Sequence, residues 1–247
     1  MSGRCLMNVP IIRKIKMAVR LLFPTYVFER DLLDPNLSEY QGCTQDYFDM
    51  LKDEMDNMRV NDPVGRQVSN AYTGWQSNDG IEKHPTFIKA LNRIERLFID
   101  EVLPFHGFHE GKVSMKIGNS WANINEYLSW NKPHLHNGCW YSGVLYIHAD
   151  SSEQGEIEFI DTDTKVVANF PHSPRTPCQF SVEPKTGKLI LFPSGLMHMV
   201  APNVTPNERY SISFNMEFDG RDIPNIPEWD ENEFLFNVDK DGNPIIK

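Results

Sequence analysis

Residues 209–216 read Arg-Tyr-Ser-Ile-Ser-Phe-Asn-Met, and this alternation decides the fold class. Successive side chains of a β-strand point to opposite faces of its sheet. One face is therefore polar, with Arg209, Ser211, Ser213 and Asn215, and the other is apolar, with Tyr210, Ile212, Phe214 and Met216. An arginine that begins the polar face of such a strand indicates an anion site inside a barrel, whereas on an edge strand it would be a surface residue.

The same two-residue period extends backward from this strand to residue 112. The short β-branched or aromatic runs are separated by turn residues such as Gly118-Asn119, Asn137-Gly138 and Pro193–Gly195. Eight or nine strands without an intervening helix indicate a sandwich, a barrel or a jelly roll. The predicted strands are 112–117, 121–128, 131–136, 141–148, 155–160, 177–182, 187–192, 196–201 and 209–218.

The first hundred residues are helical or mixed in character. Helical spacing is present over 46–58 and, more strongly, over 84–102, where Pro104 is expected to stop the helix. We expect these helices to pack on one outer face of the sheet. The predicted organisation is a 1–20 extension and a single domain over 21–247, with helical support at 45–103, a jelly-roll core at 112–218 and a tail at 219–247.

Composition limits the classes of function. The 247 residues carry a formal net charge of −10, which makes nucleic acid a poor partner. The four widely spaced cysteines are expected to be reduced thiols of a cytoplasmic protein, and no apolar stretch is long enough to span a bilayer. The basic residues of 13–20 indicate a solvated extension rather than a helix on a membrane surface.

The sequence Pro133-His134-Leu135-His136 contains the first candidate metal ligands. In a strand, His134 and His136 share a face and Leu135 points into the opposite packing layer. Two adjacent imidazoles form half of a metal site. His198, 62 residues beyond His136 in an apolar strand, would complete it from an antiparallel neighbour, although a lone buried histidine is more often a core residue.

Taken together, these segments resemble the 2-oxoglutarate- and Fe(II)-dependent oxygenases, in particular a putative-oxygenase branch with H-x-H followed by an S-G-V-x-Y strand. The resemblance covers nearly all of the chain after residue 20. The segments that carry it are Leu22–Pro24, Gly74–Ser77, Trp121–Asn125, His134–His136, Ser142–Tyr146, Leu191–Ser194 and Arg209–Asn215.

The resemblance implies a double-stranded β-helix, a jelly roll or cupin-like barrel, that binds Fe(II), 2-oxoglutarate and O2. It implies that His134 and His198 bind iron. It also implies that Arg209 pairs with the far carboxylate of 2-oxoglutarate, that Ser211 assists it, and that Tyr146 contacts the same co-substrate. Asn123 is a candidate for that pocket or for a hydrogen bond within the sheet.

One position departs from the superfamily pattern. Most members have Asp or Glu two residues after the first histidine, which completes a two-histidine, one-carboxylate iron face, and this chain has His136 there. We expect a three-histidine face, which leaves the iron one unit more positive. Alternatively, His136 only supports the site, with water in the third position or a carboxylate such as Glu158 or Asp161 reaching the metal.

The expected activity is hydroxylation of a C–H bond of an unidentified substrate, with release of succinate and CO2. Two other readings stay open: a three-histidine iron dioxygenase that does not use 2-oxoglutarate, and a non-catalytic metal-binding jelly-roll module. The long connection at 161–176 is either a lid or a plain surface loop. The acidic charge and this loop favour a small molecule or a peptide as the prime substrate.

Overall fold

The structure is a computed structural model in which backbone contacts divide the chain into two compact units, 26–222 and the two ends, 1–25 with 223–247. The predicted extension at 1–20 and most of the 161–176 connection lie outside the described residues, and the predicted domain limits stay predictions. No helix in the described ranges is long and apolar enough to cross a membrane. The structure describes residues 24–38, 42–71, 73–108, 113, 115–162, 178–219, 237–238 and 244–245.

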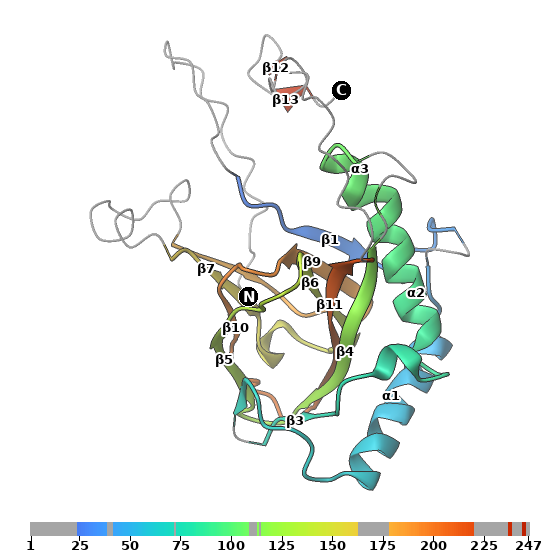
Figure 1. Ribbon diagram of the computed structural model, residues 1–247. Helices are drawn as coiled ribbons and strands as arrows, with labels where there is room; N and C mark the ends of the chain where they lie inside the picture. The colour runs from blue at the N-terminus through green and yellow to red at the C-terminus, as the bar shows by residue number, and fades with distance from the viewer. Residues whose placement is uncertain are drawn as a thin grey trace. The chain divides into compact units, whose positions relative to one another are not determined.

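The unit at 26–222 is built on two antiparallel sheets (Figure 1). The larger sheet has the order β1-β9-β6-β11-β4-β3. Its strands are β1 (Phe28–Asp31), β9 (Lys188–Pro193), β6 (Tyr141–His148), β11 (Arg209–Phe218), β4 (Met115–Asn125) and β3 (Trp75–Gln76). The smaller sheet has the order β2-β5-β10-β7-β8. Its strands are β2 (Asn70–Ala71), β5 (Trp130–His134), β10 (His198–Val200), β7 (Ile157–Ile160) and β8 (Gln179–Val182).

The two sheets form a double-stranded β-helix, which confirms the expected fold class. Central strand β11 pairs with β4 on one side and with β6 on the other. Its polar face looks into the barrel and its apolar face looks toward the helices, as the alternation over 209–216 predicts. The helices also lie on one outer face, as expected.

The helical layer packs against the larger sheet and closes the main core (Figure 1). It contains α1 (Gln45–Asn61), the 3-10 turn η1 (Ile81–Lys83), α2 (Ile88–Leu97), the π-helical turn η2 (Phe98–Val102) and α3 (Leu103–Phe105). Phe48, Leu51 and Ile94 are fully buried against Ile212 and Leu145 of the sheet. Each such side chain contributes about 1.5–3 kcal/mol relative to an exposed one.

Three local expectations need correction. The strands predicted at 112–117 and 121–128 are one strand, β4, because Gly118 forms a bulge rather than a turn: Asn215 pairs with Asn119 and Met216 with Ile117. Pro104 lies within the short helix α3 instead of following the helical segment. It is tolerated there because it occupies the first turn of α3, where the missing N–H of proline is not needed. The short strands β1, β2 and β3 were not predicted, since two to four residues carry no readable period.

In the unit formed by the chain ends, the described residues are two short strands. These are β12 (Asn237–Val238) and β13 (Pro244–Ile245), which pair antiparallel.

Candidate metal and co-substrate site

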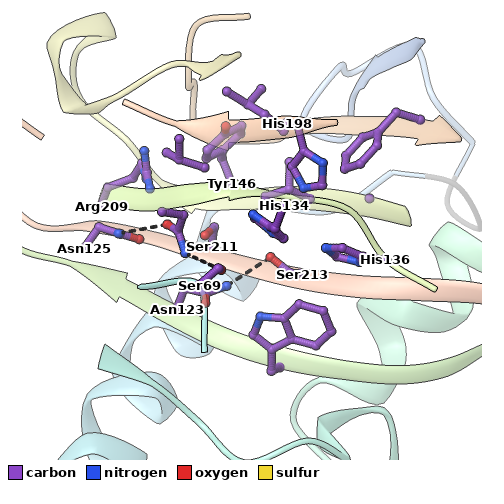
Figure 2. A pocket seen from close by; sticks show the side chains of 17 residues that line it. Ser69, Asn123, Asn125, His134, His136, Tyr146, His198, Arg209, Ser211 and Ser213 are labelled. Atoms are coloured by element: carbon purple, nitrogen blue, oxygen red, sulfur yellow. Dashed lines mark hydrogen bonds between the residues drawn. The ribbon is translucent and has the colours of Figure 1, made fainter. Parts of the chain in front are cut away.

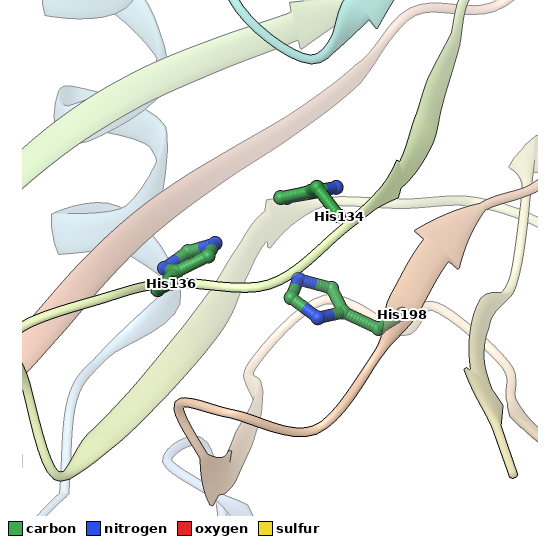
Figure 3. Close-up of side chains that lie close together, drawn as sticks. All are labelled: His134, His136 and His198. Atoms are coloured by element: carbon green, nitrogen blue, oxygen red, sulfur yellow. The ribbon is translucent and has the colours of Figure 1, made fainter. Parts of the chain in front are cut away.

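The structure brings His134, His136 and His198 together in one group (Figure 3). Their potential ligand atoms all lie within 4.8 Å of one another. The ring centroids of His134 and His198 are 4.3 Å apart, and each is 5.2 Å from the ring of His136. His134 and His198 are direct partners on β5 and β10. Three imidazoles at this spacing can share one metal ion.

A bulge in β5 sets the position of the first histidine. His198 pairs with His134, but Val200 pairs with Asn131, so one residue more is used on β5 than on β10. Pro133 lies inside this bulge, where its lack of an N–H donor breaks the ladder at no cost. Bulges commonly re-aim side chains beside active sites, and this one turns His134 toward His198.

His136 and Leu135 lie beyond the end of β5, so the strand predicted at 131–136 is too long. The backbone N–H of His136 instead donates to the carbonyl of Ser194 at 2.9 Å. The expectation that Leu135 enters a packing layer is wrong: its exposed fraction is 40%. The helices cover the other sheet, and within the described ranges no helix packs outside β5.

Each histidine has a hydrogen-bond acceptor at Nδ1. His134 Nδ1 donates to the Lys132 carbonyl at 2.6 Å, and His198 Nδ1 donates to the Leu196 carbonyl at 2.9 Å. A carbonyl can only accept, so the Nδ1 atoms carry the hydrogens and the Nε2 lone pairs are free. A metal-binding histidine is normally held in this way by its second nitrogen.

His136 receives the same support from side chains. Its Nδ1 lies 2.5 Å from Asn215 Oδ1 and 3.0 Å from Ser142 Oγ. Ser142 also donates to Asn215 Oδ1 at 2.8 Å, and Asn215 Nδ2 donates to Asn119 Oδ1 at 2.8 Å. In this arrangement the oxygen of the Asn215 amide faces the histidine and its nitrogen faces Asn119. The Nε2 atom of His136 is therefore free as well.

The three imidazoles are held neutral, which is the form that binds metal. Burial lowers the pKa of His134 and of His136. Burial, followed by the nearby His134, lowers the pKa of His198 to about 3. A site with these pKa values does not have to release protons before it takes up a cation near neutral pH.

The alternative carboxylate ligands lie elsewhere. Glu158 is opposite Met199, on the other strand face from Phe159 and His198, and it accepts from Gln179 Nε2 at 2.6 Å. Asp161 follows the end of β7, where its N–H donates to the Cys178 carbonyl. Neither belongs to the histidine group within the described part of the chain.

Arg209 occupies the other end of the same pocket (Figure 2). Its exposed fraction is 2%, and its Nη1 donates to the carbonyls of Gln154 and Gly155 at 2.8 and 2.6 Å. Gly155, at the end of the turn η3 (Ser152–Gln154), has φ +95°, and a Cβ there would lie 2.2 Å from the Ala201 carbonyl. Glycine therefore lets the backbone approach the guanidinium.

The guanidinium of Arg209 lacks a carboxylate partner among the described residues, and its Nε has no hydrogen-bond acceptor. Burial lowers the pKa of Arg209, opposed by the Tyr146 ring, whose centroid is 5.8 Å from Cζ. A buried cation without an anion is costly, so this end of the pocket fits the carboxylate of a bound ligand.

The other predicted co-substrate residues line the same pocket, whose volume is about 50 Å³. Ser211 is buried and pairs across the sheet with Asn123 on one side and Tyr146 on the other. Tyr146 is also buried, which raises its pKa. Asn123 donates from Nδ2 to Ser213 Oγ at 3.0 Å, so its amide already has a partner within the sheet.

Several polar residues that support this site were not predicted from the sequence. Asn125 pairs directly with Arg209, and Asn215 and Ser142 support His136. The signal was present in part, because Asn125 shares a strand face with Asn123, and Asn215 shares one with Arg209. The partner of each amide depends on contacts between strands that lie far apart in the sequence.

A wider cleft of about 450 Å³ opens over the histidines. It shares Ser69, Trp121, His134 and His136 with the inner pocket, so two of the three histidines also line this cleft. One wall is the 132–137 segment, and another carries the ion pair of Arg66 with Asp79, 2.6 Å apart. A second molecule can therefore approach the histidines from the side opposite Arg209.

Comparison with known proteins gives one family and one fold. Residues 119–215 match the model of a family described as putative 2OG-Fe(II) oxygenase. That segment runs from the β4 bulge to Asn215 and contains all the residues of the inner pocket except Ser69. No curated protein matches the chain.

Solved structures with the same fold have low sequence identity to this chain. A Pseudomonas putida prolyl-4-hydroxylase is 16% identical over 77% of this chain and 92% of its own, with a TM-score of 0.51. HygX from Streptomyces hygroscopicus, solved with nickel and 2-oxoglutarate, is 12% identical over 78% and 83%, with a TM-score of 0.52. The α-ketoglutarate-dependent epimerase SnoN from nogalamycin biosynthesis is 13% identical over 77% and 78%, with a TM-score of 0.55.

At these identities the structures establish the fold alone, and the matched segment contains the histidine group and Arg209. The chain is therefore similar in sequence to the putative 2OG-Fe(II) oxygenases over residues 119–215, and in fold to the solved structures above.

Proposed function

We propose that this protein hydroxylates a C–H bond of a small molecule or peptide, with Fe(II) on His134, His136 and His198 and 2-oxoglutarate anchored on Arg209. The observation that supports this assignment is the polarity of one pocket. Neutral imidazoles with free Nε2 atoms lie at one end, and a buried guanidinium without a carboxylate lies at the other. A molecule with an anion at each end fits between them.

The residues fit the two groups that the family uses. In this family, Fe(II), O2 and 2-oxoglutarate together supply an oxidation that yields succinate, CO2 and a hydroxylated product. The protein's part is to bind, orient and exclude water. Arg209 neutralises the far carboxylate, and Ser211 offers a hydroxyl on the same strand face.

An apolar wall keeps water away from the middle of this pocket. Val144, Ile157 and Phe192 line it, and they belong to a buried cluster that also contains Phe159 and Tyr146. The ring of Phe192 lies 4.7 Å from the ring of His198. Low polarity around the site strengthens the attraction between Arg209 and a carboxylate.

We assign the third ligand position to His136 rather than to a carboxylate. Its Nδ1 is bonded to the Asn215 amide and its Nε2 is free, as in the other two histidines. Three neutral ligands leave the full charge of the metal in place, because an imidazole replaces an anionic carboxylate. We therefore expect anionic ligands to bind this iron more tightly than in a two-histidine, one-carboxylate site.

We assign the prime substrate to the wider cleft. Val68 and Leu135, which are 58% and 40% exposed, provide apolar surface there, and Trp121 lines both the cleft and the inner pocket. The exposed Lys132 adds a cation. A volume of about 450 Å³ suits a small molecule or a short stretch of peptide.

The absence of a carboxylate from the histidine group, within the described residues, favours one other candidate. This is a three-histidine dioxygenase in which the substrate itself binds the iron and Arg209 holds a carboxylate of that substrate. Such an enzyme would not form succinate. We also keep the cytoplasmic location as a proposal, supported by the free thiols of Cys43, Cys139 and Cys178.

The experiment that tests the proposal is anaerobic titration of the Fe(II)-loaded protein with 2-oxoglutarate, followed by visible spectroscopy. We expect a weak metal-to-ligand charge-transfer band that disappears in Arg209→Met and is kept in Arg96→Met, whose arginine is exposed on α2. Succinate release on admission of O2 would complete the assignment. Bound iron with neither the band nor succinate would contradict it and favour the substrate-binding dioxygenase.

A further inference from the structure

Two buried side-chain atoms of the described residues have no hydrogen-bond partner, and both lie in the inner pocket. They are Arg209 Nε and Asn125 Oδ1. Arg209 and Asn125 are direct partners across β11 and β4, so the two atoms belong to neighbouring side chains (Figure 2). Buried polar groups are normally paired, and two unpaired groups side by side indicate the place of a ligand.

The guanidinium has one edge left for that ligand. Nη1 is committed to the carbonyls of Gln154 and Gly155, which leaves the edge formed by Nε and Nη2. This edge presents two parallel N–H groups and suits the two oxygens of a carboxylate. A neighbouring group that stabilises the same carboxylate has to be a donor, and a carbonyl oxygen at that place would repel it.

The orientation of the Asn125 amide is coupled to that of a short chain of hydrogen-bonded polar side chains. Asn125 Nδ2 lies 3.5 Å from Asn131 Oδ1, and Asn131 Nδ2 lies 3.1 Å from Ser69 Oγ. An amide has nearly the same shape after a rotation of 180° that exchanges its oxygen and nitrogen. The chain can therefore run in either direction without moving a heavy atom out of contact.

With a carboxylate bound at Arg209, the reversed direction satisfies more groups. The Ser69 hydroxyl then donates to the Asn131 oxygen, the Asn131 amide donates to the Asn125 oxygen, and the Asn125 N–H groups face the pocket. In the opposite direction the Asn125 oxygen stays buried, unpaired and directed at the place of an anion. The reversed chain is favoured because it replaces this repulsion with a charge-assisted hydrogen bond.

We propose that Asn125 is a second donor to the carboxylate that Arg209 binds, held in that orientation by Asn131 and Ser69. This inference rests on the proposed use of 2-oxoglutarate. It makes Asn125 a residue that selects the co-substrate. The N–H groups of Asn125 and of the charged Arg209 favour a terminal carboxylate. A terminal carboxamide is disfavoured because its NH2 group would face donors only.

The test is the dissociation constant of 2-oxoglutarate for the Mn²⁺-loaded protein, measured by calorimetry without turnover. The variants are Asn125→Leu, which keeps the volume, and Asn125→Ala, and both remove the donor. We expect either one to weaken binding by about tenfold or more, the usual value of a hydrogen bond to a charged group. Asn92→Ala, an exposed asparagine on α2, is the matched control and should bind as the unaltered protein does.

The direction in which the affinity for 2-oxoglutarate changes in the Asn125 variants tests the inference. If the Asn125 oxygen faced the ligand, both variants would remove a repulsion, and binding would stay equal or become tighter; this result would overturn the inference. A second measurement compares 2-oxoglutarate with 2-oxoglutaramate, which ends in a carboxamide. The preference for the carboxylate should fall in the Asn125 variants, and an unchanged preference would count equally against the inference.

The inclusion of Arg209→Met separates this inference from the proposed function. Binding that is weakened by Arg209→Met but not by either Asn125 variant overturns the inference alone. Failure of the unaltered, metal-loaded protein to bind 2-oxoglutarate overturns both.

Discussion

The two ends of the inner pocket differ in whether their polar groups have all their hydrogen-bond partners within the protein. At the histidine end, each Nδ1 atom has an acceptor within the chain, and the three rings are held neutral. At the arginine end, Arg209 Nε has no acceptor, and the guanidinium has no carboxylate partner among the described residues. The first end is organised in advance for a cation, and the second is completed by an anion.

The difference has a physical reason. Neutral imidazoles can be buried and hydrogen-bonded without a counter-ion, so the fold can orient them before any metal binds. A guanidinium stays charged at any physiological pH, and a permanent carboxylate partner would neutralise it and block the co-substrate. The fold therefore leaves the charge of Arg209 unpaired, at a cost to the stability of the ligand-free protein.

The largest effect is expected at the histidine end. His198→Ala removes one of the three proposed metal ligands, and we expect affinity for Fe(II) to fall by about 100-fold or more. Metal titration in the absence of O2 measures it. His148→Ala is the control, because His148 lies near Asp150, outside the histidine group. Equal metal affinities of the two variants would show that the group does not hold the metal.

The second-largest effect is expected at the arginine end of the pocket. Arg209→Met should weaken the binding of 2-oxoglutarate by about 100-fold, while the affinity for the metal stays the same. The unfolding free energy of the ligand-free protein should change by only about 1 kcal/mol, because relief from an unpaired buried charge offsets two lost hydrogen bonds to carbonyls. Calorimetry and urea unfolding measure the two quantities. A large loss of stability would mean that Arg209 has a structural rather than a ligand-binding role.

A smaller effect tests whether His136 is a ligand. Asn215→Leu removes the acceptor that orients its imidazole, and we expect metal affinity to fall by about tenfold. Restoration of an acceptor in Asn215→Asp should recover most of this loss. If metal affinity is the same in all three proteins, His136 does not bind the metal, and the two-histidine alternative gains support.

The smallest effect is a dependence of stability on pH in the metal-free protein. His198 titrates near pH 6.5 when unfolded and, with its lowered pKa, at about 3 when folded. Between these values the unfolded chain binds more protons, so stability is complete above pH 6.5 and falls as the pH falls. From pH 7.5 to 6.0 the contribution of His198 is about 1 kcal/mol. Urea unfolding should show a smaller pH dependence in His198→Ala; an identical dependence would contradict the lowered pKa.

Much of the inner pocket followed from local patterns. The alternation of 209–216 predicted which side chains of β11 enter the barrel, and the segments around His134 and His198 predicted neighbouring strands. These predictions succeed because side-chain direction in a strand depends on position within a few residues. The prediction for Leu135 failed because no local pattern shows that the strand ends at His134.

The sequence by itself determined the fold class, the histidine and arginine positions, and the family to which they point. Only the tertiary structure decided that Asn125 faces Arg209, that Asn215 supports His136, and that Asn123 is bonded within the sheet. An asparagine has the same sequence signature whether its amide binds a ligand, a histidine or a neighbouring strand. Its role depends on partners brought close by the register of distant strands, and that register is set by bulges and by the packing of the whole barrel.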